Sequence, residues 1–242
     1  MIINIFCDAS INLTTKNACG GCVIMMQDEM GITDISKRLI IQKNATNNSS
    51  EILAIWTGVV EALKLRNSFP GAIFRLFSDS KISLYGLRDW IKNWISNMSE
   101  DGTLITSSGG PVINQQRFIE VFNLIVENNL RIELYHQRGH VTDGKISKAK
   151  ARSSFIKANK VPPEALGLDI DILCYYNNII DNETRNAIGT YESGRELPPY
   201  IEVEGMQPMD YKIRASMRHQ YVRCIDKSTV TSRHDFKGGY NQ

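Results

Sequence analysis

The stretch Ile73–Trp94, IFRLFSDSKISLYGLRDWIKNW, contains the most informative pattern in the chain. Its first six residues form a short apolar run after a Pro-Gly turn signal, which predicts a buried strand. Asp79 comes where this strand ends, and Ser80 is a favourable helix N-cap residue. Ligands of α/β proteins bind at the carboxyl ends of such strands. Asp79 is therefore either an active carboxylate at the sheet edge or a residue that only helps to start the helix.

The residues after Asp79 favour the active carboxylate. They predict a helix with apolar residues at helical spacing, and this helix carries Gly86, Trp90 and Trp94. An Asp-Ser pair at a strand end, followed by a helix with two tryptophans, resembles the corresponding segment of type 1 ribonuclease H. The resemblance implies that Asp79 is catalytic, that the tryptophan pair contacts the substrate, and that further carboxylates lie elsewhere in the chain.

Two of these carboxylates are found before Asp79 in the sequence. Asp8 lies in a predicted strand within Phe-Cys-Asp-Ala-Ser, where the family usually has Asp-Gly-Ser. Glu51 ends the run Thr-Asn-Asn-Ser-Ser-Glu, which matches the family's Thr-Asn-Asn-x-x-Glu. Each acid alone would more simply be a helix cap or a solvated surface residue. Together they occur in the family's order and on the expected kinds of element, which makes coincidence a poor explanation.

The fourth carboxylate is expected in the last predicted helix. The family's Asn-x-x-Ala-Asp-x-x-Ala-Arg matches residues 177–185, with Ile180 and Thr184 in place of the alanines. This match favours Asp181, and it leaves Asp169 and Asp171 as alternatives.

The resemblance implies that Asp8, Glu51, Asp79 and Asp181 bind two Mg²⁺ ions, with Mn²⁺ as an alternative. A phosphodiester is itself negative and resists attack by an anion unless cations offset its charge. In the family mechanism Asp8 bridges both ions, Asp181 helps to hold the ion that carries the attacking water, and the other two acids hold the second ion. Glu51 is expected near the RNA 2′-hydroxyl, which would explain why RNA is cut and DNA is not.

A histidine completes the expected catalytic set. His140 follows Gly139 just after the predicted strand 131–136, as in the family's Gly-His pair. A loop histidine titrates near neutral pH and can relay a proton. His136 alternates with apolar residues on the strand, so we expect a structural role for it.

The expected partner is an RNA–DNA hybrid. By resemblance, amide side chains at Asn47 and Asn48 contact its minor groove, because they both donate and accept hydrogen bonds. Core packing is an equally good interpretation of Trp94. The expected nucleic-acid contacts outside the basic segment are Thr46, Asn47, Asn48, Ser80, Trp90 and Trp94.

A basic segment distinguishes this chain from the family pattern. Residues 145–160 carry six Lys or Arg residues and no acid, whereas residues 95–111 carry no Lys or Arg. Family members often use a basic loop after the tryptophan pair to hold the DNA strand. We therefore expect Lys148, Lys150 and Arg152 to supply that contact here, with a solvated surface helix as an equally good interpretation.

The order of predicted elements is that of an α/β ribonuclease H-like fold: a five-stranded mixed sheet flanked by helices. The predicted strands are 2–8, 20–27, 35–42, 73–78 and 131–136. The predicted helices are 50–66, 80–97 with a kink near Gly86, 112–128, 147–158 and 169–188. We expect a ribonuclease H domain over 1–190, with a basic insertion at 141–168, and a partly disordered C-terminal extension over 191–242.

Composition sets the broad class of the protein. The chain has 242 residues, of which 42% are hydrophobic and 22% charged, and its net charge is +2. These values are ordinary for a globular protein, and we expect a monomer without a membrane partner. An odd number of cysteines and the lack of a signal sequence favour a reduced, cytoplasmic protein. Cys19-Gly-Gly-Cys22 has metal-site spacing, but without a second pair we expect small residues in a strand.

The sequence thus predicts an enzyme, a ribonuclease H, that cleaves the RNA strand of hybrids and leaves 5′-phosphate and 3′-hydroxyl ends. Two alternatives keep the fold: a DNA nuclease or strand-transfer enzyme, and a non-catalytic hybrid-binding module.

Overall fold

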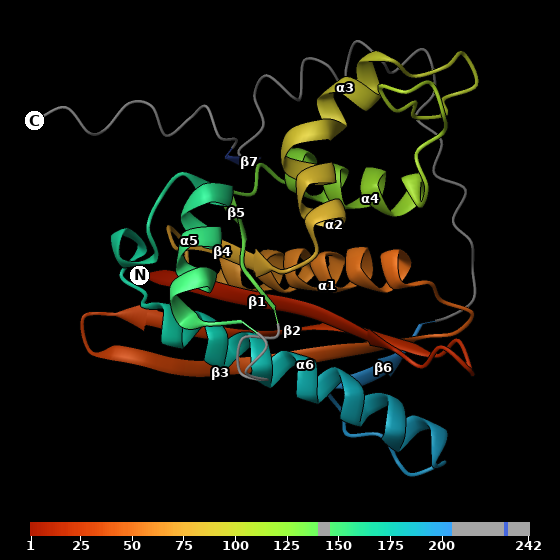
Figure 1. Cartoon of the computed structure of the whole chain (residues 1–242). Helices are drawn as coiled ribbons and strands as arrows, with labels where there is room; N and C mark the ends of the chain where they lie inside the picture. Colours follow the sequence, from red (N-terminus) through yellow and green to blue (C-terminus); the bar gives the residue numbers. More distant parts are fainter. Residues whose placement is uncertain (140–145, 205–229, 232–242) are drawn as a thin grey trace, which may run out of the picture.

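The computed structural model describes residues 1–139, 146–204 and 230–231. Its centre is a mixed sheet with the strand order β6-β3-β2-β1-β4-β5-β7 (Figure 1). The five predicted strands form the middle of this sheet: β1 (Ile2–Ile11), β2 (Ala18–Asp28), β3 (Gly31–Gln42), β4 (Ile73–Ser78) and β5 (Ile132–His136). β1 to β3 pair antiparallel, whereas β4 pairs parallel with both β1 and β5. The predicted mixed α/β architecture is confirmed.

Two short strands extend the sheet beyond the prediction. β6 (Ile201–Val203) pairs parallel with β3, and β7 (Val230–Thr231) pairs parallel with β5. Both come from the region expected as a C-terminal extension, so this region adds a strand to each edge of the sheet.

The helices lie close to their predicted positions: α1 (Asn47–Ser68), α2 (Lys81–Tyr85), α3 (Ile91–Ser96), α4 (Gln115–Glu127), α5 (Lys148–Asn159) and α6 (Ile170–Glu192). A π-helical turn (Gly86–Trp90) joins α2 to α3 at the predicted kink, and a short 3₁₀ helix (Pro163–Leu166) precedes α6. α1 begins three residues before the predicted start. The cause is Thr46, whose side chain accepts a hydrogen bond from the Ser49 backbone N–H at 3.1 Å.

The sheet separates two apolar cores. On one face Ile3, Ile5 and Cys7 of β1 pack with α1 to α4, and on the other face Phe6 packs with α5 and α6. Figure 1 shows this layering, with α2, α3 and α4 stacked beyond α1 and with α6 across the opposite face. The alternation of side chains along β1 is the one that the sequence predicts.

One close approach fixes where α1 lies. A Cβ atom at Gly20 of β2 would lie 2.7 Å from the Ser50 carbonyl oxygen and 2.9 Å from the Ala54 nitrogen. Only glycine permits this contact between strand and helix backbones. The first turn of α1, including Glu51, is therefore held directly against the sheet.

The described cysteines are free and buried. Cys19 and Cys22 belong to the cores on opposite faces of the sheet, so they cannot share a metal ion, and their interpretation as small strand residues is supported. No helix in the described ranges is long and apolar enough to cross a membrane.

Candidate active site

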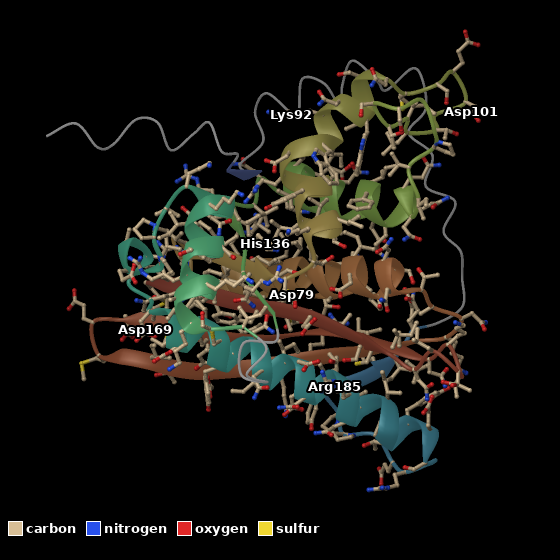
Figure 2. The ribbon with its side chains drawn as sticks, viewed as in Figure 1. Asp79, Lys92, Asp101, His136, Asp169 and Arg185 are labelled. Atoms are coloured by element: carbon tan, nitrogen blue, oxygen red, sulfur yellow. The ribbon has the colours of Figure 1, made fainter. Side chains whose placement is uncertain are left out.

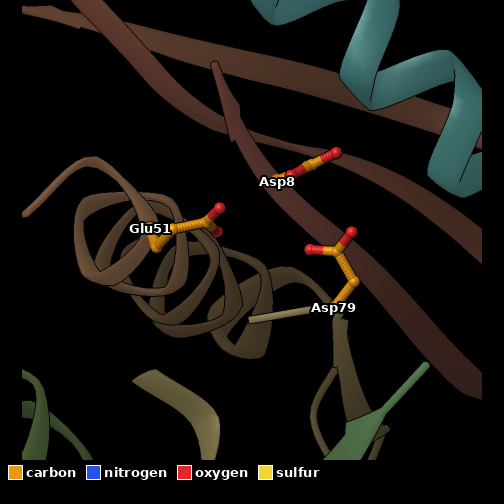
Figure 3. Close-up of side chains that lie close together, drawn as sticks. All are labelled: Asp8, Glu51 and Asp79. Atoms are coloured by element: carbon orange, nitrogen blue, oxygen red, sulfur yellow. The ribbon is translucent and has the colours of Figure 1, made fainter. Parts of the chain in front are cut away.

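Three of the four predicted carboxylates converge beside the carboxyl end of β4, in the middle of the sheet. One carboxylate oxygen each from Asp8, Glu51 and Asp79 lies within 4.8 Å of the others. Figure 3 shows them approaching from β1, from α1 and from the end of β4. The parallel register aligns Cys7 with Ser78, which puts the next residues, Asp8 and Asp79, side by side. The strand pairing and the helix contact at Gly20 thus assemble the cluster.

Asp8 is buried, and Glu51 and Asp79 are half-buried. Burial raises the pKa of Asp8 well above its usual range, and the charges of Asp79 and Glu51 raise it further. Burial, followed by the charges of Asp79 and Asp181, raises the pKa of Glu51 to about 8. The Oε2 atom of Glu51 is buried and has no hydrogen-bond partner among the described residues. Three carboxylates gathered in this way offer the oxygen ligands that hard divalent cations such as Mg²⁺ prefer.

Asp181 lies near this cluster, but it is not one of the three residues whose carboxylate oxygens lie within 4.8 Å of one another. Its side chain is mostly buried on α6, and its Oδ2 pairs with Arg185 one helical turn later at 2.6 Å. Its negative charge contributes to the raised pKa of both Asp8 and Glu51. The amide of Gln137, beyond β5, donates to Asn177 at 2.6 Å and ties α6 to this part of the sheet one turn before Asp181.

The two alternative acids occupy other positions. Asp169 caps α6 by accepting from the Ile172 backbone N–H at 2.7 Å, and Asp171 pairs with Lys148 at 2.6 Å. Both belong to the start of α6, and ten residues of helix between Asp171 and Asp181 span about 15 Å. In Figure 2, Asp169 lies at the opposite end of α6 from Arg185 and away from Asp79.

A cleft of about 540 Å³ opens beside the cluster. Its lining includes Glu51, Asp79 and the predicted contact residues Asn47, Asn48 and Ser80. Thr46 lies next to it as the cap of α1.

Two exposed cations that the sequence interpretation missed, Lys81 and Arg138, also line this cleft. Neither makes an ion pair within the described ranges. Both residues adjoin predicted site motifs in the sequence, Asp79-Ser80 and Gly139-His140, and this position could have identified them as cleft residues.

The predicted tryptophans line a neighbouring groove of about 470 Å³. Trp90 is 38% exposed, whereas Trp94 is buried and packs edge-on against Phe118 with ring centroids 5.1 Å apart. Asn48 and Ile82 line both the groove and the cleft, so the two are adjacent. Core packing of Trp94 is thus observed, and its remaining surface still faces the groove.

The segment after β5 touches Asp79 directly. A Cβ atom at Gly139 would collide with the Asp79 carboxylate, so the close approach requires glycine. His136 is buried, and its Nε2 lies 3.2 Å from the backbone oxygen of Asp79. A carbonyl only accepts, so Nε2 carries the hydrogen. Burial, followed by the charge of Lys81, lowers the pKa of His136 to about 4, which keeps the ring neutral. His140 lies outside the described residues.

The basic segment forms α5, and Lys145 lies outside the described residues. Lys148 pairs with Asp171 at 2.6 Å, and Arg152 pairs with Glu164 at 2.8 Å. Lys150 is exposed and makes no ion pair within the described part of the chain. The acids that neutralise Lys148 and Arg152 lie beyond residue 160, which is why the charge count within the segment did not reveal them.

The fold and site define an α/β protein with a cluster of three carboxylates, suited to a cation, at the carboxyl end of its central strands. A sequence profile of the RNase H family matches residues 2–151, and the chain belongs to this family. The predicted family is therefore confirmed. The matched residues end inside α5, so Asp181 lies beyond them.

Known proteins similar to this chain include a ribonuclease H from Thermosynechococcus vestitus. It is 30% identical over 125 residues, which cover 49% of this chain and 71% of that protein. Among solved structures, the prototype foamy virus protease-reverse transcriptase is 19% identical with a TM-score of 0.45, over 64% of this chain and 20% of that one. This chain thus spans a fifth of the viral protein. LC11-RNase H1 in complex with an RNA/DNA hybrid is 14% identical with a TM-score of 0.42, over 71% of this chain and 98% of that one.

Proposed function

We propose that this protein hydrolyses the RNA strand of RNA–DNA hybrids at internal positions and leaves 5′-phosphate and 3′-hydroxyl ends. The observation that carries the proposal is the convergence of Asp8, Glu51 and Asp79 within 4.8 Å in a chain of the RNase H family. The relative from Thermosynechococcus vestitus is named a ribonuclease H, which supports the same activity.

Divalent ions, Mg²⁺ with Mn²⁺ as an alternative, are the proposed cofactor. Asp8, Glu51 and Asp79 would hold them, because a cation would offset their repulsion and would bind the Glu51 Oε2 atom, which has no hydrogen-bond partner among the described residues. Asp181 is the proposed fourth ligand, and its support is its burial and its electrostatic effect on Asp8 and Glu51. When bound, two such ions lower the pKa of a water molecule and stabilise the leaving oxygen.

The remaining roles belong to the residues around the cleft. Asn47 and Asn48 offer amides that accept from and donate to 2′-hydroxyl groups and base edges. Glu51, which lines the same cleft, is proposed to distinguish RNA from DNA by the 2′-hydroxyl. The exposed Trp90 offers an apolar surface for the DNA strand. His140 is proposed to relay a proton from the loop that Gly139 begins.

The deciding experiment is incubation of a labelled hybrid with the protein and Mg²⁺, beside double-stranded DNA and double-stranded RNA. The expected result is internal cuts in the RNA strand of the hybrid alone, with loss of cleavage in EDTA. Cleavage of double-stranded DNA would instead support a DNA nuclease. Binding of the hybrid without any cleavage would support a non-catalytic module.

A further inference from the structure

The last residue of α5 completes the end of β5. Asn159 is buried, and its amide nitrogen donates to the His136 carbonyl oxygen at 2.7 Å. Its amide oxygen accepts from the His136 backbone N–H at 2.9 Å. These are the two hydrogen bonds that a neighbouring strand would make with one residue. A single side chain thus replaces a strand partner at the point where β5 reaches the active site.

A buried arginine fixes the orientation of this amide. Arg88, in the π-helical turn, donates to the Asn159 amide oxygen at 3.1 Å and to the Leu134 carbonyl oxygen at 3.3 Å. The Asn159 amide nitrogen also donates to the Phe155 carbonyl oxygen at 3.0 Å. Arg88 supplies only donors and the carbonyls only acceptors, so the two ends of the amide are distinguishable. The arginine's own charge is balanced by Asp89 at 3.1 Å.

The residue that Asn159 holds is in contact with Asp79. The His136 ring donates to the backbone oxygen of Asp79, and Figure 2 shows the two residues close together. The next residue, Gln137, donates from its backbone N–H to the Ser78 carbonyl oxygen at 3.0 Å. Two residues later the Gly139 backbone lies against the Asp79 carboxylate. A shift of His136 would therefore move the two groups that contact Asp79, which are the His136 ring and the Gly139 backbone.

We infer that Asn159 is a positioning residue of the active site, which acts through His136 and Gly139 to hold Asp79 in the carboxylate cluster. The inserted segment thus braces the cation site, and Asn159 does so from outside the residues that match the family profile. This inference rests on the proposed function, because it assumes that the cluster binds divalent cations. Weakening a hydrogen-bonded support of metal ligands typically lowers metal affinity about tenfold or more.

The test compares Asn159→Leu, which has a similar volume and no hydrogen-bonding groups, with the control Asn4→Leu. Asn4 is also a buried amide; it bonds to Gln27 at 3.3 Å and lies near the start of β1, four residues before Asp8. Mg²⁺ affinity is measured by calorimetry without hybrid, well below the melting temperature of both variants. Turnover is then measured at saturating hybrid over a range of Mg²⁺ concentrations.

The expected result is that Asn159→Leu lowers Mg²⁺ affinity about tenfold and raises the Mg²⁺ concentration for half-maximal turnover. Its KM for the hybrid should stay near the wild-type value. Asn4→Leu should leave Mg²⁺ affinity unchanged. If Asn159→Leu loses stability but keeps wild-type Mg²⁺ affinity, Asn159 is only a structural residue and the inference is wrong.

A second variant decides the question if Asn159→Leu does not fold. Asn159→Asp keeps the acceptor for the His136 N–H and Arg88 but loses the donor to the His136 carbonyl oxygen. It should weaken Mg²⁺ binding in the same direction, and unchanged binding would overturn the inference. Failure of the proposed function is recognised separately, because the wild-type protein would then not cleave the RNA strand of the hybrid, whatever the Asn159 variants do to Mg²⁺ affinity.

Discussion

Asp8, Glu51 and Asp79 lie together although their negative charges repel one another. Burial strengthens this repulsion because less water screens the charges. We therefore expect the repulsion to destabilise the fold locally when no cation is bound, and the proposed cations to relieve it. Substitutions that remove one charge should separate these two effects.

Asp79→Asn should abolish cleavage and leave the fold intact. The amide keeps the side-chain volume but removes a charge that the cations require, so we expect a loss of at least about a hundredfold in turnover. Without divalent ions the variant should melt about 2–4 °C higher, the shift that about 1 kcal/mol makes in a chain of this size. Near-normal Mg²⁺-dependent turnover in a folded variant would rule out the metal-binding role.

Asp181→Asn should also lose activity, whereas Asp171→Asn and Asp169→Asn should lose little. Of these three acids, only Asp181 contributes to the raised pKa of Glu51, whereas Asp171 pairs with Lys148 and Asp169 caps the α6 backbone. The three variants form a matched series on one helix. A hydrolysis assay that ranks Asp171 or Asp169 above Asp181 would move the fourth ligand to the start of α6.

The Cys19 thiol should resist alkylation in the folded protein. Burial raises its pKa to about 12, so the reactive thiolate is scarce at pH 8 and increases only as the pH rises towards that value. Peptide-resolved mass spectrometry after treatment with iodoacetamide should show modification of Cys19 in denaturant and not in buffer. Equal rates in both conditions would contradict its buried position in β2.

At the scale of elements, α5 has a buried side and an exposed basic side. Its buried side contacts the sheet through Phe155 and Asn159, which anchor the helix. Its exposed side carries Lys148, Lys150, Arg152 and Lys157. Exposed ion pairs contribute little free energy, so Lys148 and Arg152 remain able to exchange their acids for phosphates.

Changing these four residues together to alanine should weaken hybrid binding with less effect on turnover at saturating substrate. Each lost phosphate contact should reduce the slope of log affinity against log salt by about 0.7 to 0.9. The pair Lys150→Ala and Lys157→Ala should account for more of this change than the ion-paired Lys148 and Arg152. Wild-type affinity and salt slope in the fourfold variant would show that α5 does not hold the hybrid.

At the scale of the whole molecule, the chain after α6 returns to the sheet. β6 pairs with β3, Glu202 binds Arg38 at 2.9 Å, and Glu204 binds Arg117 of α4. We therefore propose that the folded domain extends past the predicted boundary at residue 190, at least to these contacts.

Truncation after Ser193 should lower the melting temperature by several degrees, because it removes β6 and both ion pairs, and each 1 kcal/mol corresponds to about 2–4 °C. Truncation after Glu204 serves as the control, since it keeps these contacts. Thermal unfolding of the two shortened proteins distinguishes them. Equal melting temperatures would mean that β6 does not stabilise the domain.

The sequence alone predicted the features that depend on neighbouring residues. Alternation along β1 predicted the two faces of the sheet, and the cap before α1 predicted its approximate start. Periodicity and capping act within a few residues, so they are readable in one dimension. Family resemblance supplied the expectation that the acids meet.

Only the tertiary structure decided which distant groups are partners. The pairing of Arg152 with Glu164, the strand β6 beside β3, and the amide of Asn159 on His136 join segments with no common local pattern. From the local sequence alone, these residues would be predicted to be solvated or to form turns. Their roles arise because folding buries specific backbone groups and charges, and each of these must then find a partner that the local sequence does not contain.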